Sequence, residues 1–343
     1  MATDTDFFLP PQYIHQIADQ VTRMGSRLPD WFMQSVKPGP GGELDIPHLS
    51  FQDFLRLMRE ALALTREPAF GLLLGERLLI NSHGVLGYAA VNSQTLQQAI
   101  DLLEQYMLLR TSLLAVRQVV EGDRLRLVFV EPRPLEDLRA PVLEAVVLTI
   151  KNLIDYVTMG TCRVSRAVFS FGPPAHEGLA RDLFKCEVLY DASWAGLEIP
   201  LSQLRLPLRS ANPQAWQEAV ARCEDELAKL QRQQSLATQV RQLMLGKQGG
   251  FPSLQVTARL LNLTPRTLHR RLQDEGTSYR DILEDIRHTL AIEHLRTGRL
   301  TIQEIAFMLG YDDQANFRRA FKRWEGVPPT AYRSAPTDPR HAP

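Results

Sequence analysis

Apolar positions in the last third of the chain follow one pattern twice. Each copy predicts two short helices joined by a tight turn, because apolar residues recur at intervals of three and four on both sides of a turn residue. Matching positions lie 48 residues apart before the turn and 49 after it, as in the pairs Ala258 with Ala306 and Leu268 with Phe317. We therefore predict two helix-turn-helix motifs, whose core residues are Ala258, Leu268, Leu272, Ala306, Gly310, Phe317 and Phe321.

The polar residues around these positions agree with that prediction. Ser253 and Thr301 are expected N-caps, and Thr301 with Glu304 has the form of a capping box. A sharp turn between two helices needs a residue that tolerates positive φ, which Asn262 and Gly310 provide. A helical bundle that uses alanine and glycine only for packing could explain one copy, but two copies favour the motif.

Two further helices are predicted around the motifs. One precedes the first motif at 235–245, and a longer one connects the two motifs at about 279–295. Arg287 and Arg296 are expected on the exposed side of the connecting helix. Its buried side is expected to hold Ile282, Ile286, Leu290 and Leu295.

The first 212 residues mix helical and strand periodicity, which predicts one α+β domain. Strands at 113–120 and 124–130 are separated by Glu121, Gly122 and Asp123, residues typical of a hairpin turn. Helices are expected near 11–27, 50–64, 67–79, 94–109, 135–159 and 177–184, and further strands at 163–171, 187–190 and 196–199.

A helix after Pro213 carries apolar residues at alternating intervals of four and three. This is a short heptad seam formed by Trp216, Val220, Cys223, Leu227 and Leu230. Two alternatives follow: the seam pairs with its copy in a second subunit, which we favour, or it packs on its own domain. Residues 231–234 are polar and are expected to form a linker.

Three stretches of the second motif resemble the AraC/XylS transcriptional regulators: IQEIAFMLGY at 302–311, FRRAFKR at 317–323 and GVPPTAYR at 326–333. Residues 84–89, GVLGYA, and the helix that ends at Tyr106 are similar to the long N-terminal domain, described as arabinose-binding-like, of one branch of that family. The resemblance implies an α+β sensor or dimerisation domain joined to an all-α domain with two helix-turn-helix motifs. No sugar-binding residue is carried over, because this N-terminal region is longer and more helical than the compact barrels of the founding sensors.

The resemblance and the charge distribution together suggest a domain plan. Residues 235–335 hold 15 Lys and Arg against 10 Asp and Glu, a surplus of five, although the whole chain is neutral. A basic module beside an acidic partner is typical of a nucleic-acid-binding protein with a separate sensor. We expect an effector-binding or dimerisation domain at 1–212, a linker helix at 213–234, the DNA-binding domain at 235–335 and a tail at 336–343.

The exposed faces of the second helix in each motif are expected to contact DNA. Arginine can bind guanine bidentately, and glutamine or asparagine can pair with adenine. The candidates for base contacts are Arg266, His269, Arg270, Gln314, Asn316 and Arg319. The candidates for phosphate contacts, which orient the protein without reading sequence, are Arg271, Arg318, Lys322 and Arg323.

Other classes of function find little support in the residues. In residues 1–234 the four histidines, His15, His48, His83 and His176, are dispersed, and there is no phosphate-binding or dinucleotide-binding glycine motif and no paired metal ligands. We therefore expect no catalysis, cofactor or metal. His83 is expected to be structural. The three scattered cysteines predict reduced thiols, and the lack of a membrane span or basic leader predicts a cytoplasmic protein. Four aromatic residues could line an effector pocket, although each is more typical of a core: Tyr88, Tyr106, Tyr156 and Trp194.

The sequence therefore predicts a sequence-specific transcription regulator that binds the major groove of promoter DNA. The resemblance implies a homodimer, contact with RNA polymerase and activation as the commoner outcome. We expect the N-terminal domain to sense a small molecule, with its ligand-binding residues unassigned. The alternative is a ligand-independent regulator whose N-terminal domain only dimerises or binds a protein.

Overall fold

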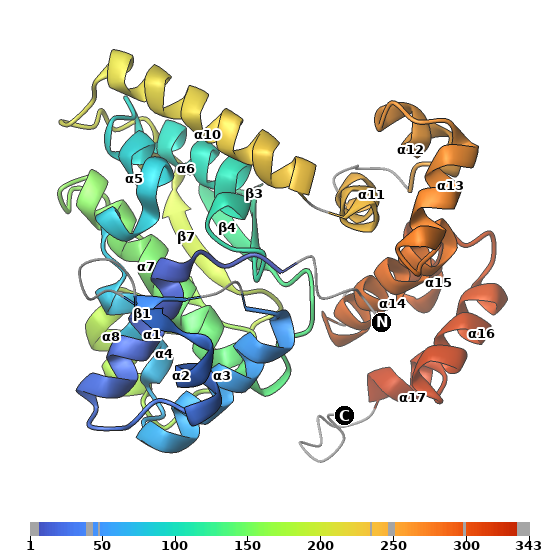
Figure 1. Cartoon of the computed structure of the whole chain (residues 1–343), viewed down its shortest axis with the longest axis horizontal. Coiled ribbons are helices and arrows are strands. Elements are labelled where there is room, and N and C mark those ends of the chain that lie inside the picture. Colours follow the sequence, from blue (N-terminus) through green and yellow to red (C-terminus); the bar gives the residue numbers. More distant parts are fainter. Residues whose placement is uncertain are drawn as a thin grey trace. The chain divides into compact units, whose positions relative to one another are not determined.

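The computed structural model describes residues 7–38, 44–46, 49–233, 235–245, 251–297 and 300–334. The chain divides into a larger unit, Phe7–Arg232, and a smaller unit that begins at Gln233 (Figure 1). Within the described ranges, no helix combines the length and the apolar character that crossing a membrane requires.

The larger unit is built mainly from helices. Ser50 caps α3 by accepting a hydrogen bond from the backbone N–H of Asp53, and Thr95 caps α6 in the same way through Gln98. The helices are α1 (Pro11–Arg23), α2 (Asp30–Ser35), α3 (Phe51–Thr65), α4 (Phe70–Arg77), α5 (Gly84–Val91), α6 (Leu96–Tyr106), α7 (Arg139–Val157), α8 (Glu177–Phe184), α9 (Leu201–Leu204) and α10 (Pro213–Gln233). Short 3-10 turns, η2 (Ile80–His83), η3 (Met107–Leu109) and η4 (Glu136–Leu138), precede or follow them.

Helices α4 and α7 pack at unusually short range in the centre of this unit. A Cβ atom on Gly75 would stand 2.6 Å from the backbone oxygen of Ala145, so only glycine permits this approach. The surrounding core is continuous and includes the fully buried side chains of Leu57, Phe70 and Phe169. The apolar faces of these helices therefore pack into one common core.

A five-stranded sheet completes the larger unit. Its order is β3 (Ala115–Glu121), β4 (Arg124–Val130), β7 (Gly196–Pro200), β5 (Arg166–Val168) and β6 (Glu187–Leu189), and only β5 and β6 pair in parallel. A separate two-stranded ribbon joins β1 (Lys37–Pro38) to β2 (Leu44–Asp45). Glu121 pairs with Arg124 across a two-residue turn, as the hairpin prediction requires.

The smaller unit is helical. Its elements are α11 (Leu236–Leu245), α12 (Leu254–Leu260), α13 (Pro265–Asp274), α14 (Tyr279–Thr297), α15 (Ile302–Met308), α16 (Gln314–Glu325) and α17 (Pro329–Ser334). One core surrounds Leu268 and Leu272, and a second surrounds Phe317 and Phe321. Leu290 of the long helix α14 packs against both cores, so this helix joins the two halves.

The fold class matches the prediction, whereas several boundaries differ. The strand expected at 163–171 is only Arg166–Val168, and α2, α5 and α9 were not predicted. Helix α5 is apolar almost throughout, so it lacks the amphipathic period that identifies a surface helix. Helix α10 continues to Gln233 instead of ending in a polar linker at 231, and all but its last residue belongs to the larger unit. Residue 234 lies outside the described ranges.

Candidate nucleic-acid interface and effector pocket

The first motif consists of α12 and α13 and a turn at Asn262. Asn262 adopts φ 54°, and the next backbone N–H, that of Leu263, donates to the carbonyl oxygen of Ala258 at 2.8 Å. Thr264 then caps α13 by accepting from the backbone N–H of Thr267. Ala258 is fully buried, so its small side chain allows the two helices to approach.

The second motif repeats this geometry with α15 and α16. Gly310 adopts φ 72°, and the backbone N–H of Tyr311 donates to the carbonyl oxygen of Ala306 at 3.0 Å. Thr301 and Glu304 form the capping box at the start of α15. Asp313 caps α16. The two turns therefore have equivalent backbone conformations and occupy equivalent positions in the two copies of the sequence pattern.

Arg287 corrects one expectation about the connecting helix. Its guanidinium does not project into solvent, because Nε donates to the carbonyl oxygen of Leu309 and Nη2 to that of Gly310, both at 2.8 Å. The same group lies 4.6 Å from the centre of the Tyr311 ring. Arg287 thus holds the turn of the second motif against α14. The side chain of Arg296 lies outside the described part of the chain.

The first recognition helix, α13, presents its candidate DNA contacts to solvent. Leu268 and Leu272 are fully buried and fix which face points outward. The exposed side chains on the opposite face are Arg266, His269, Arg270 and Arg271. Three of the four are arginines, which is the charge and donor chemistry that a DNA groove requires.

On α16 the candidates differ in how firmly they are held. Asn316 is only half exposed, because its Nδ2 donates to the carboxylate of Asp313 at 2.8 Å and its Oδ1 accepts from Arg319 at 2.7 Å. Arg323 donates to Glu284 at 2.7 Å. Gln314 is also half exposed, whereas Arg318 and Lys322 are exposed. Asn316, Arg319 and Arg323 would have to exchange these bonds to contact DNA.

Helix α10 lies along α5 and α6 of its own domain (Figure 1), and its apolar face packs against them. Cys223 is fully buried with Leu86 and Ala89 of α5 and Leu102 and Tyr106 of α6. The other seam residues, Trp216, Val220, Leu227 and Leu230, are partly buried against the same cluster. The structure therefore has the second of the two arrangements that the sequence allowed, and this face is not a free dimer contact.

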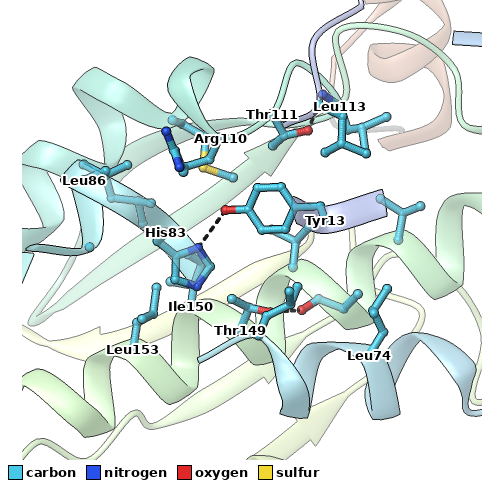
Figure 2. Close-up of a pocket in the computed structure, with 18 of the residues that line it drawn as sticks. Tyr13, Leu74, His83, Leu86, Arg110, Thr111, Leu113, Thr149, Ile150 and Leu153 are labelled. Atoms are coloured by element: carbon cyan, nitrogen blue, oxygen red, sulfur yellow. Dashed lines mark hydrogen bonds between the residues drawn. The ribbon is translucent and has the colours of Figure 1, made fainter. Parts of the chain in front are cut away.

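A cavity of about 140 Å³ lies in the helical part of the larger unit. Helices α1, α3, α4, α5, α6 and α7 all contribute to its wall, and most lining side chains are aliphatic. Its polar groups are Tyr13, His83, Arg110, Thr111 and Thr149 (Figure 2). A mostly apolar cavity with a few polar groups is the usual form of a small-molecule site.

Tyr13 and His83 form a buried pair at one end of this cavity. The Tyr13 hydroxyl and His83 Nδ1 are 2.8 Å apart (Figure 2). Burial lowers the pKa of His83 to about 4, and the nearby charge of Arg110 acts in the same direction, so the imidazole is neutral near pH 7. Burial raises the pKa of Tyr13 to about 12, although the Arg110 charge opposes this shift. His83 has the structural contact that the sequence suggested, and it also faces the cavity.

Arg110 is the cationic group at the same end. Its side chain is 12% exposed, and the nearest carboxylate oxygen, Glu226 Oε2 of α10, is 3.9 Å from Nη2. Arg110 Nε is buried without a hydrogen-bond partner. Guanidinium groups buried to this degree ordinarily have all their donors paired.

The aromatic residues that the sequence offered as pocket candidates do not line the cavity. Tyr88 and Tyr156 are largely exposed, Tyr106 is buried beneath α10, and Trp194 lies next to Arg126 of the sheet. Arg110 was not predicted from the sequence as a cavity residue, although it is a lone cation directly after the apolar run Met107–Leu109. Within the described ranges, no group of three or more His, Cys, Asp or Glu could hold a metal, and all three cysteines are free.

Both units match known protein families. Residues 43–208 match the arabinose-binding domain of AraC transcription regulators, and residues 257–335 match a helix-turn-helix domain. The chain is 36% identical to the Ornithine utilization regulator of Pseudomonas aeruginosa over 331 residues, which cover 96% of this chain and 97% of that relative.

Two further proteins of Pseudomonas aeruginosa are similar. The HTH-type transcriptional regulator VqsM is 32% identical over 163 residues, which cover 47% of this chain and 50% of that one. The crystal structure of the transcriptional regulator CdpR covers 96% of this chain and 99% of its own at 23% identity, with a TM-score of 0.49. On the matches to both domains and the full-length relative, this chain belongs to the AraC family of DNA-binding transcription regulators.

Proposed function

We propose that each chain recognises two successive major grooves on one face of promoter DNA and that a small molecule in the N-terminal cavity controls this binding. The observation that carries the first half is the pair of equivalent motifs joined through α14. Leu290 packs in both cores, and Arg287 holds the second turn, so the two recognition helices have one common support. Successive major grooves lie about 34 Å apart, so one chain would cover roughly two helical turns.

The proposed DNA contacts separate into two kinds. Arg266, His269 and Arg270 of α13 would contact base edges, as would Gln314, Asn316 and Arg319 of α16. Their exposed or half-exposed positions opposite the buried leucines and phenylalanines support this assignment. Phosphate contacts are assigned to Arg271, Arg318, Lys322 and Arg323, which would orient the protein on the duplex.

The cavity supports the proposed control by a ligand. Leu86 of α5 lines the cavity and also packs in the cluster beneath α10. Helix α10 is followed directly in the chain by α11, the first helix of the DNA-binding unit. A ligand that binds one arrangement of α5 and α10 better than another would shift the population of DNA-binding states by that difference in affinity.

We also propose that the protein is a homodimer and an activator that contacts RNA polymerase. Family membership supports both statements. Because the inner face of α10 is covered by its own domain, the dimer contact is assigned to a surface other than that face. A dimer would cover two of the sites that one chain covers, which makes a repeated operator the expected target.

A random-library DNA selection with the full-length protein, at a stated salt concentration, tests the proposal. The expected result is a repeated site whose internal spacing is about one helical turn. Expression of the adjacent genes in strains with and without the protein gives the sign of control. Enrichment of a site one groove wide would contradict the two-motif arrangement. Binding and transcription that respond to no metabolite would favour the ligand-independent alternative.

A further inference from the structure

We infer that the ligand of the cavity is a small apolar carboxylic acid whose carboxylate binds Arg110 in place of Glu226. The inference rests on the proposed role of the cavity as the effector site and specifies the chemistry of the effector. It also names the contact through which the cavity acts on α10.

The wall of the cavity selects for an apolar body. Of the described residues that line it, Arg110 alone carries a charge, since His83 is neutral and no Asp or Glu takes part. A ligand ammonium group would therefore lose its hydration without gaining a carboxylate partner. The volume, about 140 Å³, is close to that of the engineered protein cavity of roughly 150 Å³ that binds benzene, so the body should be about one ring or a short alkyl chain.

Arg110 selects for a carboxylate. Its guanidinium is nearly buried, its Nε has no hydrogen-bond partner, and Glu226 stands 3.9 Å from Nη2, at the outer limit of an ion pair. A planar guanidinium binds a carboxylate through two parallel hydrogen bonds, and this contact is strongest where water is excluded. A ligand carboxylate would supply the pairing that the free protein leaves incomplete.

Tyr13 can supply a second donor to the same carboxylate. Figure 2 shows Tyr13 and Arg110 at the same end of the cavity, with the phenol oxygen directed at His83. In the tautomer with its proton on Nδ1, neutral His83 donates to that oxygen. The phenol hydrogen is then available to the ligand. In that tautomer the Tyr13–His83 pair positions a donor and adds no charge.

The same contact couples the cavity to α10. Glu226 lies on α10, and its side chain is 44% exposed, so water can solvate its carboxylate once Arg110 turns to a ligand. A ligand carboxylate and Glu226 therefore compete for one cation. Ligand binding therefore weakens the attraction between Glu226 of α10 and Arg110. An effector that makes such a contact in one state only can shift the equilibrium between two arrangements of α10.

Calorimetric titration of the full-length protein with matched acids and amides tests the inference. The probes are benzoate against benzamide and hexanoate against hexanamide. The acids should bind about tenfold or more tighter than their amides, the advantage expected of a charge-assisted pair. Arg110→Gln should remove this preference, whereas Arg163→Gln, an exposed arginine in the same unit, should leave it unchanged.

Glu226→Gln gives a second test that does not alter the cavity wall. Removing the competitor should tighten the binding of both acids severalfold and leave the amides unchanged. Equal affinity for acid and amide in the unmodified protein, or an unchanged acid affinity in Glu226→Gln, would overturn the inference.

The remaining outcomes separate this inference from the proposed function. Binding of the amides in preference to the acids would refute the carboxylate class but leave the cavity as an effector site. Absence of binding by all probes would overturn the inference, while the DNA selection would independently show whether the two-groove proposal stands.

Discussion

Arg287 donates from Nε to the carbonyl oxygen of Leu309 at 2.8 Å, which ties the turn of the second motif to the helix between the motifs. Nη2 makes an equal bond to the carbonyl of Gly310. Carbonyl oxygens at the end of a helix carry partial negative charge and lack partners within the helix, so a cation is well placed there. One side chain thereby ties the turn that precedes α16 to α14.

Replacing Arg287 with alanine should lower the stability of the second motif by about 2 kcal/mol or more, since two hydrogen bonds from a charged group are lost. Affinity for the full site should fall, and contacts on the half of the site bound by α16 should weaken most. Urea unfolding and DNA footprinting measure the two effects. Arg280→Ala is the matched control on the same helix, because Arg280 forms only an exposed pair with Glu284 and its loss should change stability by about 0.5 kcal/mol or less. Equal effects of the two substitutions would contradict the role of Arg287.

Position 310 should tolerate only residues that can adopt positive φ. Gly310 has φ 72°, and a Cβ atom there would lie 3.2 Å from Arg287 Nη2. Valine is strained at positive φ, at a cost of roughly 1–2 kcal/mol or more, whereas asparagine tolerates it. Gly310→Val should therefore abolish specific DNA binding and leave the N-terminal unit folded.

Gly310→Asn is the control for that substitution, because Asn262 occupies the equivalent turn of the first motif at φ 54°. It should retain most of the binding. Thermal unfolding and binding to the selected operator give both comparisons. Similar behaviour of the valine and asparagine variants would mean that backbone strain does not decide the outcome.

The sequence predicted the C-terminal unit closely because its local signals agree with one another. Ser253, Thr264, Thr301 and Asp313 all cap helices, and the two turn residues both have positive φ. Where caps, turn residues and apolar spacing coincide, the helix boundaries are determined locally. Arg287 escaped prediction because its partners are 22 and 23 residues away, and only the tertiary fold brings them together.

The cavity could not be predicted from local patterns. Tyr13, His83 and Arg110 come from α1, η2 and the turn after η3, and no spacing in the sequence relates them. The heptad seam of α10 was visible, but the same spacing suits a second copy or a neighbouring helix. Which partner the seam contacts depends on which apolar surface the rest of the domain leaves uncovered. Here α5 and α6 present that surface.

Two adjacent arginines on α13 should give different binding phenotypes. Arg270→Ala should cost about 1–3 kcal/mol on the selected site and relax sequence preference at one position, if Arg270 binds a guanine edge. Arg271→Ala should weaken binding to all sequences alike and reduce the slope of log K against log salt by about 1. Both side chains are exposed, so neither change should unfold the domain. A uniform loss in Arg270→Ala would reassign it to phosphate.

His83 should make the N-terminal unit less stable in acid. Its pKa is about 4 in the folded protein and about 6.5 in an unfolded chain. Between these values the unfolded chain binds a proton that the folded one excludes, so the free energy of unfolding falls as pH falls from 6.5 to 4. The full loss is about 3 kcal/mol, and above pH 6.5 His83 contributes no pH dependence.

His83→Gln isolates this contribution, because glutamine keeps a polar side chain beside Tyr13 and does not titrate. Urea unfolding of both proteins at pH 7, 6, 5 and 4 gives the comparison. The carboxylates titrate in both proteins and cancel in the difference. Between pH 7 and 4 the variant should lose less stability than the unmodified protein, whatever its stability at pH 7. Parallel curves would mean that His83 has the same pKa in the folded and unfolded states, so that burial does not exclude its proton.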